Sequence, residues 1–387
     1  MNDTSLIETE RLLGDLIAFP SISADSNMDL IGYVADYLDG HGARVMISED
    51  ETGTKANIFA TLGPDADGGI ILSGHTDVVP VADQDWTSDP FQMTAREGRL
   101  FGRGTCDMKG FIAATLAMAP EFASRAQTRP VHFAFTYDEE VGCLGAQALV
   151  ADLVASGLRP DIAIIGEPTE MRVIEGHKGC RETTTHFTGC EGHGSAPDLG
   201  VNAAEYAARY VGRLLELRET LKSRAPEDSR FEPPWSTLSI GKISGGTAHN
   251  VIAGKAHVEW DFREVQESDG SFLDQEITAY VDQVLRPAMQ AVDPSADIVT
   301  EVISDIAGLM PMDDNAAVAL IRDLTGANGA DLVAFGTEAG LFQRAGVNAV
   351  VCGPGSIREA HKPDEYIARD QLGACLDMLS RLSERLS

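Results

Sequence analysis

Positive charge is scarce in this chain. Its 387 residues include 30 Lys and Arg against 60 Asp and Glu, which gives a formal net charge of −30. A protein field of that sign repels phosphate groups, so we expect neither nucleic acid nor an anionic membrane as a partner. Long apolar runs are also missing: none approaches the roughly 20 residues of a membrane span, and residues 1–4 lack the basic and apolar regions of a secretory leader. These absences predict a cytoplasmic protein.

Cysteine is sparse as well. The six cysteines show no close pairing apart from Cys180 and Cys190, so reduced thiols are expected. A chain of 387 residues is long for a single apolar core, and we expect it to divide into two domains.

Apolar runs of strand length alternate with helix-forming segments. Residues 69–74, 131–137 and 161–166 are apolar runs typical of strands buried on both faces. Residues 110–118 and 144–155 are rich in Ala, Leu and Met, which favours helices. This alternation predicts an α/β fold with a mostly parallel central sheet.

Acidic and histidine side chains follow these runs or stand in glycine-rich turns. They are His75, Asp77, Asp107, Glu139, Glu140, Glu167 and His361. Each has a simpler interpretation when taken alone, as a polar turn, the first turn of a helix or a loop boundary. Because ligands usually bind at the carboxyl ends of parallel strands, we interpret their joint occurrence as one site.

The charge of this set predicts a metal site. Converging acids repel one another unless a cation neutralises them. Mixed imidazole and carboxylate ligands suit zinc, with cobalt and manganese as substitutes, and a carboxylate shared by two ions gives a hydrolytic site. Asp107 is the best candidate for the shared ligand, because glycines bracket its turn. Glu139 and Glu140 cannot easily face the same ion, so one would bind metal while the other accepts a proton from water.

A second block of sequence has a different organisation. Residues 181–187, 237–243 and 256–262 are strand-like, whereas 201–224 and 272–291 have helical spacing. The order of these segments, with a last strand after the second helix, predicts a small ferredoxin-like domain.

Several motifs together resemble one family. They are residues 73–80, 85–91, 100–110, 138–140, 164–169, 177–179 and 353–365. On these motifs the chain resembles the aminoacylase, acetylornithine deacetylase and succinyl-diaminopimelate desuccinylase family of dizinc metallohydrolases. The resemblance implies a zinc-peptidase-like catalytic domain at 1–179 and 306–387, with an inserted lid and dimerisation domain at 180–305.

The resemblance also implies a role for each acid and histidine. His75 and Glu167 would bind one zinc, Glu140 and His361 the other, and Asp107 would bridge them. Glu139 would be the general base, and Asp77 would orient the ligand histidine. The peptide bond after Asp107 is expected to be cis.

Further residues are expected to contact substrate. By resemblance, His193 would reach the active site of a partner subunit and stabilise the oxyanion, which implies a homodimer. Asn250, Gly355 and Ser356 would bind substrate, and Arg263 would clamp its α-carboxylate unless it forms an ordinary surface ion pair. Glu338 either pairs with a cationic substrate side chain or begins a helix.

The expected reaction is hydrolysis of an N-acyl amino acid. The resemblance points to removal of the acetyl group from N2-acetyl-L-ornithine, which gives L-ornithine and acetate in arginine biosynthesis. Another N-acyl amino acid and succinyl-diaminopimelate remain open as substrates. A binding module without metal is a further alternative, against which Glu139 and the complete set of ligand residues argue.

Overall fold

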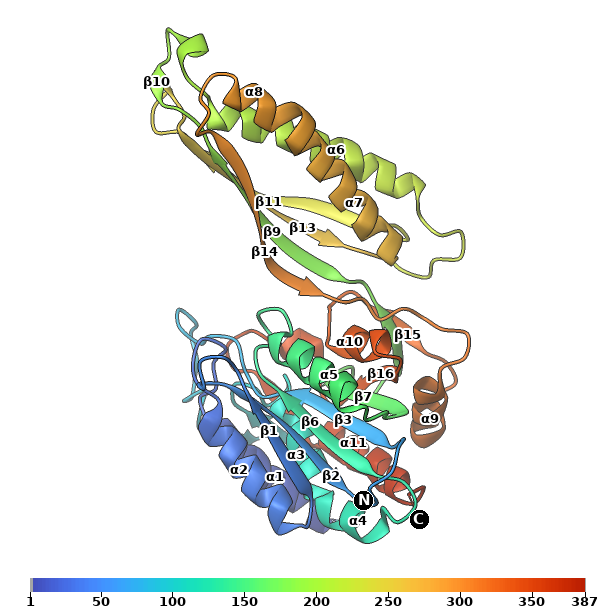
Figure 1. The fold of residues 1–387 in the computed structure, drawn as a ribbon. Coiled ribbons are helices and arrows are strands. Elements are labelled where there is room, and N and C mark those ends of the chain that lie inside the picture. Colours follow the sequence, from blue (N-terminus) through green and yellow to red (C-terminus); the bar gives the residue numbers. More distant parts are fainter. Residues whose placement is uncertain (1–2, 387) are drawn as a thin grey trace. The chain divides into compact units, whose positions relative to one another are not determined.

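The chain forms two compact units in a computed structural model that describes residues 3–386 (Figure 1). Unit 1 comprises Met1–Gly176, Pro311–Val333 and Thr337–Ser387, and unit 2 comprises His177–Met310 and Ala334–Gly336. The domain boundaries predicted from the sequence, residues 180 and 305, fall just inside unit 2. The brief return of the chain to unit 2 at Ala334 was not expected.

Unit 1 is built on an eight-stranded sheet in the order β1-β2-β6-β3-β7-β16-β8-β15. Its strands are β1 (Arg44–Glu49), β2 (Ala56–Leu62), β3 (Ile70–His75), β6 (Val131–Thr136), β7 (Ile162–Pro168), β8 (Ile174–His177), β15 (Asp331–Val333) and β16 (Asn348–Gly353). The middle strands β6, β3, β7 and β16 are parallel, whereas β1, β2 and β8 pair antiparallel with their neighbours. This confirms the α/β fold.

Helices cover both faces of this sheet, as expected of strands with continuous apolar runs. Those of unit 1 are α1 (Asp3–Ile17), α2 (Met28–Gly40), α3 (Lys109–Ala117), α4 (Ala119–Arg125), α5 (Leu144–Ser156), α9 (Ala316–Thr325), α10 (Ala339–Arg344) and α11 (Arg369–Ser383). One face, which includes Leu72 and Phe133, packs into a core with α1, α2, α3 and α11. The other face meets α5 and α10, which also contact each other.

A small antiparallel sheet completes unit 1. It has the order β17-β5-β4, with β4 at Thr94–Arg96, β5 at Arg99–Phe101 and β17 at Tyr366–Ala368, and a short 3-10 turn lies at Ile357–Glu359. The sheet therefore joins the chain around residue 100 to the chain around residue 367.

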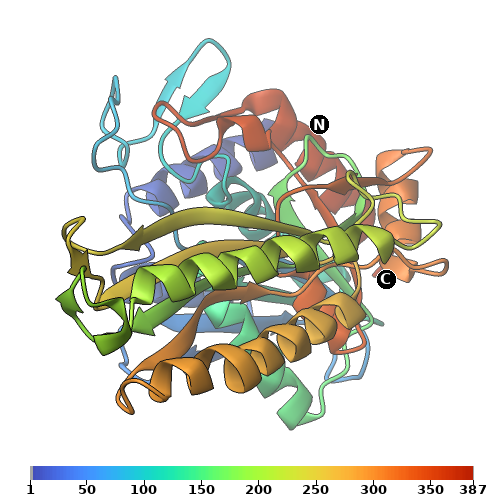
Figure 2. The same ribbon diagram turned by 90° about the horizontal axis from the view of Figure 1, so that it is seen from above.

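Unit 2 has the strand-helix order predicted for a ferredoxin-like domain. Its main elements are β9 (Cys180–Thr188), α6 (Ala203–Ser223), β11 (Thr237–Gly245), β13 (Lys255–Arg263), α7 (Glu267–Tyr280), α8 (Arg286–Gln290) and β14 (Asp297–Ile306). The strands form an antiparallel sheet in the order β11-β13-β9-β14. Figure 2 shows α6 and α7 lying across one face of it, where they bury Tyr210, Trp260 and Leu273.

The second helix of unit 2 differs from its prediction in two ways. It begins at Glu267 rather than at residue 272, and a π-helical turn at Val281–Leu285 separates α7 from α8. Helical periodicity at residues 272–291 gave no sign of the widened turn, because its first and last residues, Val281 and Leu285, are both buried.

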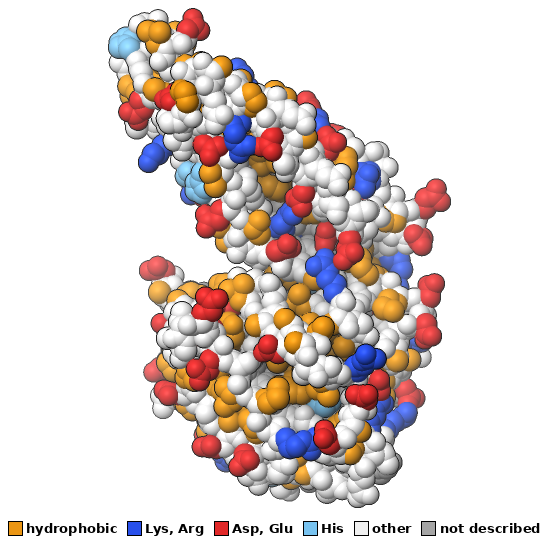
Figure 3. Space-filling model, in the orientation of Figure 1, with side chains coloured by type: hydrophobic (Ala, Val, Ile, Leu, Met, Phe, Trp, Pro, Cys, Tyr) orange, Lys and Arg blue, Asp and Glu red, His pale blue; other side chains and the backbone are white. Residues whose placement is uncertain are grey.

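Charge is spread over the surface of both units. Figure 3 shows Asp and Glu side chains scattered over the face drawn, interspersed with Lys and Arg. Within residues 3–386, none of the helices is long and apolar enough to cross a membrane.

Candidate metal centre

The acids and the first histidine lie at the carboxyl ends of the central strands of the unit 1 sheet. His75 is the last residue of β3, Glu139 and Glu140 follow β6, and Glu167 lies near the end of β7. These three strands are parallel neighbours, so their carboxyl ends meet. Asp107 comes from the turn before α3, and the peptide bond after it is cis, as the resemblance implied.

Asp107 lies between two imidazole rings. Its Oδ1 is 3.0 Å from His75 Nε2, and its Oδ2 is 3.2 Å from His361 Nε2. His361 Nε2 also approaches Glu140 Oε2 at 3.1 Å, and His75 Nε2 lies 3.8 Å from Glu167 Oε1. The structure therefore brings together all five residues predicted to bind metal.

Two sets of ligand atoms are close enough to hold an ion. The first is His75, Glu139 and Glu167 and the second is His75, Asp107 and Glu140, with the atoms of each set within 4.8 Å of one another. The grouping by distance differs from the resemblance, which pairs Glu140 with His361 and leaves Glu139 without an ion. His361 Nε2 lies close to both Asp107 and Glu140, which is compatible with the pairing that the resemblance implies.

Burial raises the pKa of the acids at these strand ends. It is the largest cause that raises the pKa of Glu139 and Glu167 well above the ordinary value, and the negative charge of Asp107 adds to it. Burial would also raise the pKa of Asp107, but hydrogen bonds with His361 and His75 outweigh it and lower that pKa. Bonds to Asp107 and Glu140 raise the pKa of His361 to about 10.

The residues present fit divalent metal ions. Glu167 is 4% exposed, and its Oε1 is buried without a hydrogen-bond partner among the described residues. A buried carboxylate oxygen in that state is costly unless a cation meets it. The available atoms are imidazole nitrogens and carboxylate oxygens, which zinc and related ions accept as ligands.

Asp77 holds three parts of the site at once. Its Oδ1 lies 3.5 Å from His75 Nδ1 and accepts a hydrogen bond from the Glu139 backbone N–H at 3.1 Å. Its Oδ2 accepts from the Glu140 N–H at 3.3 Å and from the Ser23 hydroxyl at 2.8 Å. His75 Nδ1 lies closer to the Asp77 backbone carbonyl, at 2.8 Å, and a carbonyl or carboxylate behind a ligand histidine fixes the orientation of that ring, so Asp77 suits the orienting role predicted for it.

Lys55 and Ser23, which the sequence did not single out, support the Glu139 turn through hydrogen bonds. Asp138 has φ +54°, and both of its oxygens accept hydrogen bonds from Lys55 Nζ, at 2.7 and 2.5 Å. The Ser23 hydroxyl donates a hydrogen bond to Asp77, which in turn accepts one from the Glu139 backbone N–H. Both Ser23 and Lys55 are far from this turn in the sequence, and no local pattern connects them with it.

Gly355 and Ser356 lie beside the Asp107 turn. Gly355 has φ +90°, and a Cβ there would meet Cys106 Sγ at 2.6 Å, so the close approach requires glycine. The Ser356 carbonyl accepts a hydrogen bond from Cys106 Sγ–H at 3.3 Å, and the Gly355 carbonyl accepts one from the Glu170 N–H at 2.7 Å. These residues thus connect the Asp107 turn with the end of β7.

Glu338, which was expected to contact substrate or to begin a helix, is buried against two strands of the unit 1 sheet. It is 1% exposed and immediately precedes α10. One carboxylate oxygen accepts a hydrogen bond from the Ser73 hydroxyl at 2.5 Å, and the other accepts from the Thr136 hydroxyl at 2.9 Å. Both oxygens thus accept hydrogen bonds from hydroxyls of β3 and β6, and the pairing of Glu338 with a substrate cation stays a prediction.

Unit 2 brings two of its three predicted site residues together. His193 and Val251 are cross-strand partners in a two-stranded ribbon of β10 (Gly192–His193) and β12 (Val251–Ile252). The neighbouring Asn250 accepts a hydrogen bond at its carbonyl from the Gly194 N–H at 2.8 Å. Both His193 and Asn250 are exposed.

Arg263 lies elsewhere in unit 2. It ends β13, and near the other end of that strand Ala256 pairs with Gly245, the last residue of β11 before the loop that leads to Asn250. The seven steps from Ala256 to Arg263 span roughly 23 Å, at about 3.3 Å per residue. Its Nε donates to Asp261 Oδ2 at 2.8 Å, so the ion pair considered from the sequence is present.

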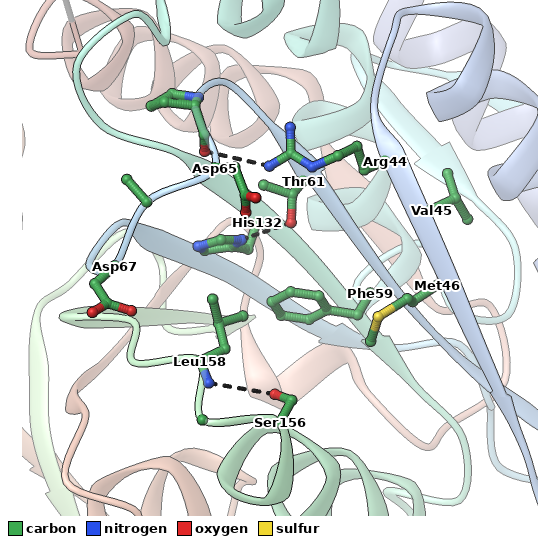
Figure 4. Close-up of a pocket in the computed structure, with 13 residues that line it drawn as sticks. Arg44, Val45, Met46, Phe59, Thr61, Asp65, Asp67, His132, Ser156 and Leu158 are labelled. Atoms are coloured by element: carbon green, nitrogen blue, oxygen red, sulfur yellow. Dashed lines mark hydrogen bonds between the residues drawn. The ribbon is translucent and has the colours of Figure 1, made fainter.

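A pocket of about 520 Å³ lies near the amino end of β6, at the opposite end of the parallel strands from the acids (Figure 4). It is lined by Phe59, Met46 and His132 among others, and His132 stands near the start of β6 rather than its end. Burial lowers the pKa of His132 to about 4, and its Nδ1 lies 2.9 Å from the Thr61 hydroxyl. A single neutral imidazole with exposed Asp65 and Asp67 does not reproduce the acidic cluster.

Replacing Glu167 by glutamine is expected to stabilise the metal-free protein at high pH. The folded state raises the pKa of Glu167 above its ordinary value of 4.5, so the native protein binds the extra proton and loses stability as pH rises past that value. Each unit of that rise corresponds to about 1.4 kcal/mol. In thermal melts with a chelator, the melting temperature of Glu167→Gln should exceed that of wild type near pH 8 and match it near pH 4.5. A variant that melts lower than wild type near pH 8 would contradict this.

Comparison with known proteins places this geometry in a family. The profile of peptidase family M20/M25/M40 matches residues 71–385. An acetylornithine deacetylase from Photorhabdus laumondii is 37% identical over 378 residues, which cover 96% of this chain and 95% of the relative. An acetylornithine deacetylase from Proteus mirabilis is also 37% identical, over 380 residues, with 96% and 95% covered.

Solved structures share the fold at lower identity. An M20 family metallo-carboxypeptidase from Sulfolobus solfataricus superposes with a TM-score of 0.75 at 16% identity, over 98% of this chain and 99% of that chain. A dinuclear metal-binding peptidase of family M20 from Bacillus subtilis gives a TM-score of 0.63 at 14% identity, over 99% and 98%. With a matching profile over most of its length and relatives above one-third identity, the chain belongs to peptidase family M20/M25/M40.

Proposed function

We propose that this protein is a cytoplasmic, homodimeric dizinc amidohydrolase that removes the acetyl group from N2-acetyl-L-ornithine, giving L-ornithine and acetate. The observation that carries the reaction type is the Asp107 carboxylate between His75 and His361, with Glu139 buried alongside. The relatives named acetylornithine deacetylase support the substrate and, with it, a place in arginine biosynthesis.

Glu139 is suited to move the proton that hydrolysis requires. When bound, two divalent ions would polarise the acyl carbonyl and acidify water. Glu139 accepts a proton from the attacking water as the new C–O bond forms, and it returns that proton to the amine nitrogen as the C–N bond breaks. Burial raises the pKa of Glu139, and Asp77 accepts a hydrogen bond from its backbone N–H at 3.1 Å, which holds the residue at the site.

The exposed ribbon of unit 2 that carries His193 supports the assignment of unit 2 as a lid. His193 Nδ1 lies 2.7 Å from the Ser195 hydroxyl, which orients the ring on a short exposed ribbon. We assign this ring to the oxyanion in the active site of a partner subunit, where a fixed donor stabilises developing charge. Asn250, beside His193, would contact substrate in the same partner site, whereas Arg263 would exchange its bond with Asp261 for the α-carboxylate of the substrate in its own subunit.

The burial of Glu338 keeps a second class of substrate in consideration. If its carboxylate stays bound to Ser73 and Thr136, it cannot select a cationic side chain by direct contact. Other N-acyl amino acids, including a succinylated diaminopimelate, therefore remain the second candidates.

Turnover of a small substrate panel tests the proposal. The zinc-loaded protein should be offered N-acetylornithine, N-acetylmethionine and N-succinyl-diaminopimelate, with amine release followed for each. We expect the highest kcat/KM with N-acetylornithine. A preference for the succinylated substrate would keep the hydrolytic site but replace the proposed substrate.

Glu338→Gln is expected to affect all acetylated substrates alike. Glutamine keeps the shape of the side chain, and the hydroxyls of Ser73 and Thr136 can rotate to suit its amide. The loss in kcat/KM should stay below about tenfold and should be equal for N-acetylornithine and N-acetylmethionine. A loss of about tenfold or more confined to N-acetylornithine would show instead that Glu338 meets the substrate ammonium.

A further inference from the structure

The loop that carries His361 has an unfavourable backbone. His361 has φ +63° and Asp364 has φ +55°, a region that residues other than glycine seldom adopt. The His361 side chain is also 52% exposed, whereas His75 is 1% exposed. A ligand on such a loop needs support from behind, because its own packing does not fix its position.

Hydrogen bonds from residues 84–103 supply that support. The side-chain amide of Gln84 donates to the His361 carbonyl at 3.1 Å, and Arg103 Nη1 donates to the Lys362 carbonyl at 3.3 Å. The Thr87 N–H and hydroxyl both donate to Asp364 Oδ1 at 3.0 Å. The loop is therefore held along its length by one segment of unit 1.

Glu365 connects this loop with the Asp107 turn. It is 0% exposed, and its Oε1 accepts hydrogen bonds from the backbone N–H groups of Cys106 at 2.8 Å and Asp107 at 3.1 Å. Its Oε2 accepts from Arg103 Nη1 at 2.7 Å. Arg103 is 1% exposed, and its Nη2 donates to Gln84 Oε1 at 2.6 Å.

We propose that Gln84, Arg103 and Glu365 form a clamp that positions His361 relative to Asp107. The clamp rests on the proposed function, and it would set the affinity for the ion held by Asp107, Glu140 and His361. The three are positioning residues: Gln84 and Glu365 contact the backbone of ligand residues, and Arg103 joins these two side chains. Loss of a partner behind a metal ligand typically weakens metal binding about 10–100-fold.

Gln84 is the best probe of the clamp. It is half-buried, so Gln84→Ala leaves no charge unpaired in the interior. Arg103→Ala would leave Glu365 buried without its partner, which is strongly destabilising. The variant should therefore fold while losing the bond to the His361 carbonyl and the bonds that Gln84 Oε1 accepts from Arg103 and from the Trp86 ring N–H.

The test is calorimetric titration of the metal-stripped protein with Zn²⁺. Wild type should bind two ions, and Gln84→Ala should bind one of them about 10–100-fold more weakly while the other is unchanged. Arg369→Ala is the matched control, because Arg369 also joins distant segments of unit 1 through bonds to Glu10 at 2.7 and 2.8 Å. It should leave both affinities unchanged.

A double-mutant cycle separates positioning from general loosening of the fold. If Gln84 acts through His361, then Gln84→Ala should cause no further loss of zinc affinity in a His361→Ala background. A full additional loss there, or unchanged affinities in Gln84→Ala, would overturn the clamp while wild type still binds two ions. A wild type that binds fewer than two ions would contradict the proposed function and the clamp together.

Discussion

Glu139→Ala is expected to lower kcat by about 10²–10⁴-fold while the protein retains two metal ions. In the assignment proposed here Glu139 moves a proton and binds neither ion, so its loss removes general-base catalysis alone. Burial raises the pKa of Glu139, and the hydrogen bond from its backbone N–H to Asp77 holds the residue in place. The measurements are steady-state kinetics and metal content on the same zinc-loaded sample.

The adjacent glutamate provides the control for this substitution. Glu140 lies 3.1 Å from His361 Nε2, so Glu140→Ala should lower affinity for zinc, and added zinc should restore part of its activity. If Glu139→Ala instead lost zinc and Glu140→Ala kept it, the two roles would be exchanged, as the grouping of His75, Glu139 and Glu167 by distance allows.

Asp107→Ala is expected to remove metal from the whole site. Its two oxygens each face a different histidine, and in the proposed assignment it is the ligand that both ions share. Affinity for each ion should fall by more than the roughly 100-fold known for residues behind a ligand. Asp67→Ala, an exposed aspartate at the opposite end of the parallel strands, is the control and should bind zinc like wild type. Two tightly bound ions in Asp107→Ala would contradict the bridging assignment.

Those parts of the fold governed by local patterns could be predicted from the sequence. The strands that carry His75 and Glu167 are continuous apolar runs, and their length and flanking glycines distinguish them from helices. Parallel strands then bring their carboxyl ends together, so convergence of the acids followed from topology. The roles of these residues required the resemblance, because distance alone does not decide between Glu139 and Glu140.

Contacts between distant segments could not be predicted in this way. Nothing near Glu338 in the sequence shows that Ser73 and Thr136 will satisfy its carboxylate, and an acid after Gly336-Thr337 suits a pocket or a helix start equally. Gln84 and Arg103 likewise meet the His361 loop only in the folded chain. Such residues act through hydrogen bonds whose partners are set by tertiary packing, and hydrophobic periodicity carries no information about them.

In the proposed function, this site hydrolyses an acetyl amide with two bound ions. Acetate release from N-acetylornithine should therefore be measured on one preparation in three states: as purified, after removal of metal by a chelator, and after addition of two equivalents of Zn²⁺. We predict that chelation abolishes acetate release and that the second equivalent restores it fully. Undiminished acetate release by protein shown to contain no metal, or none at all from the fully zinc-loaded protein, would contradict the account.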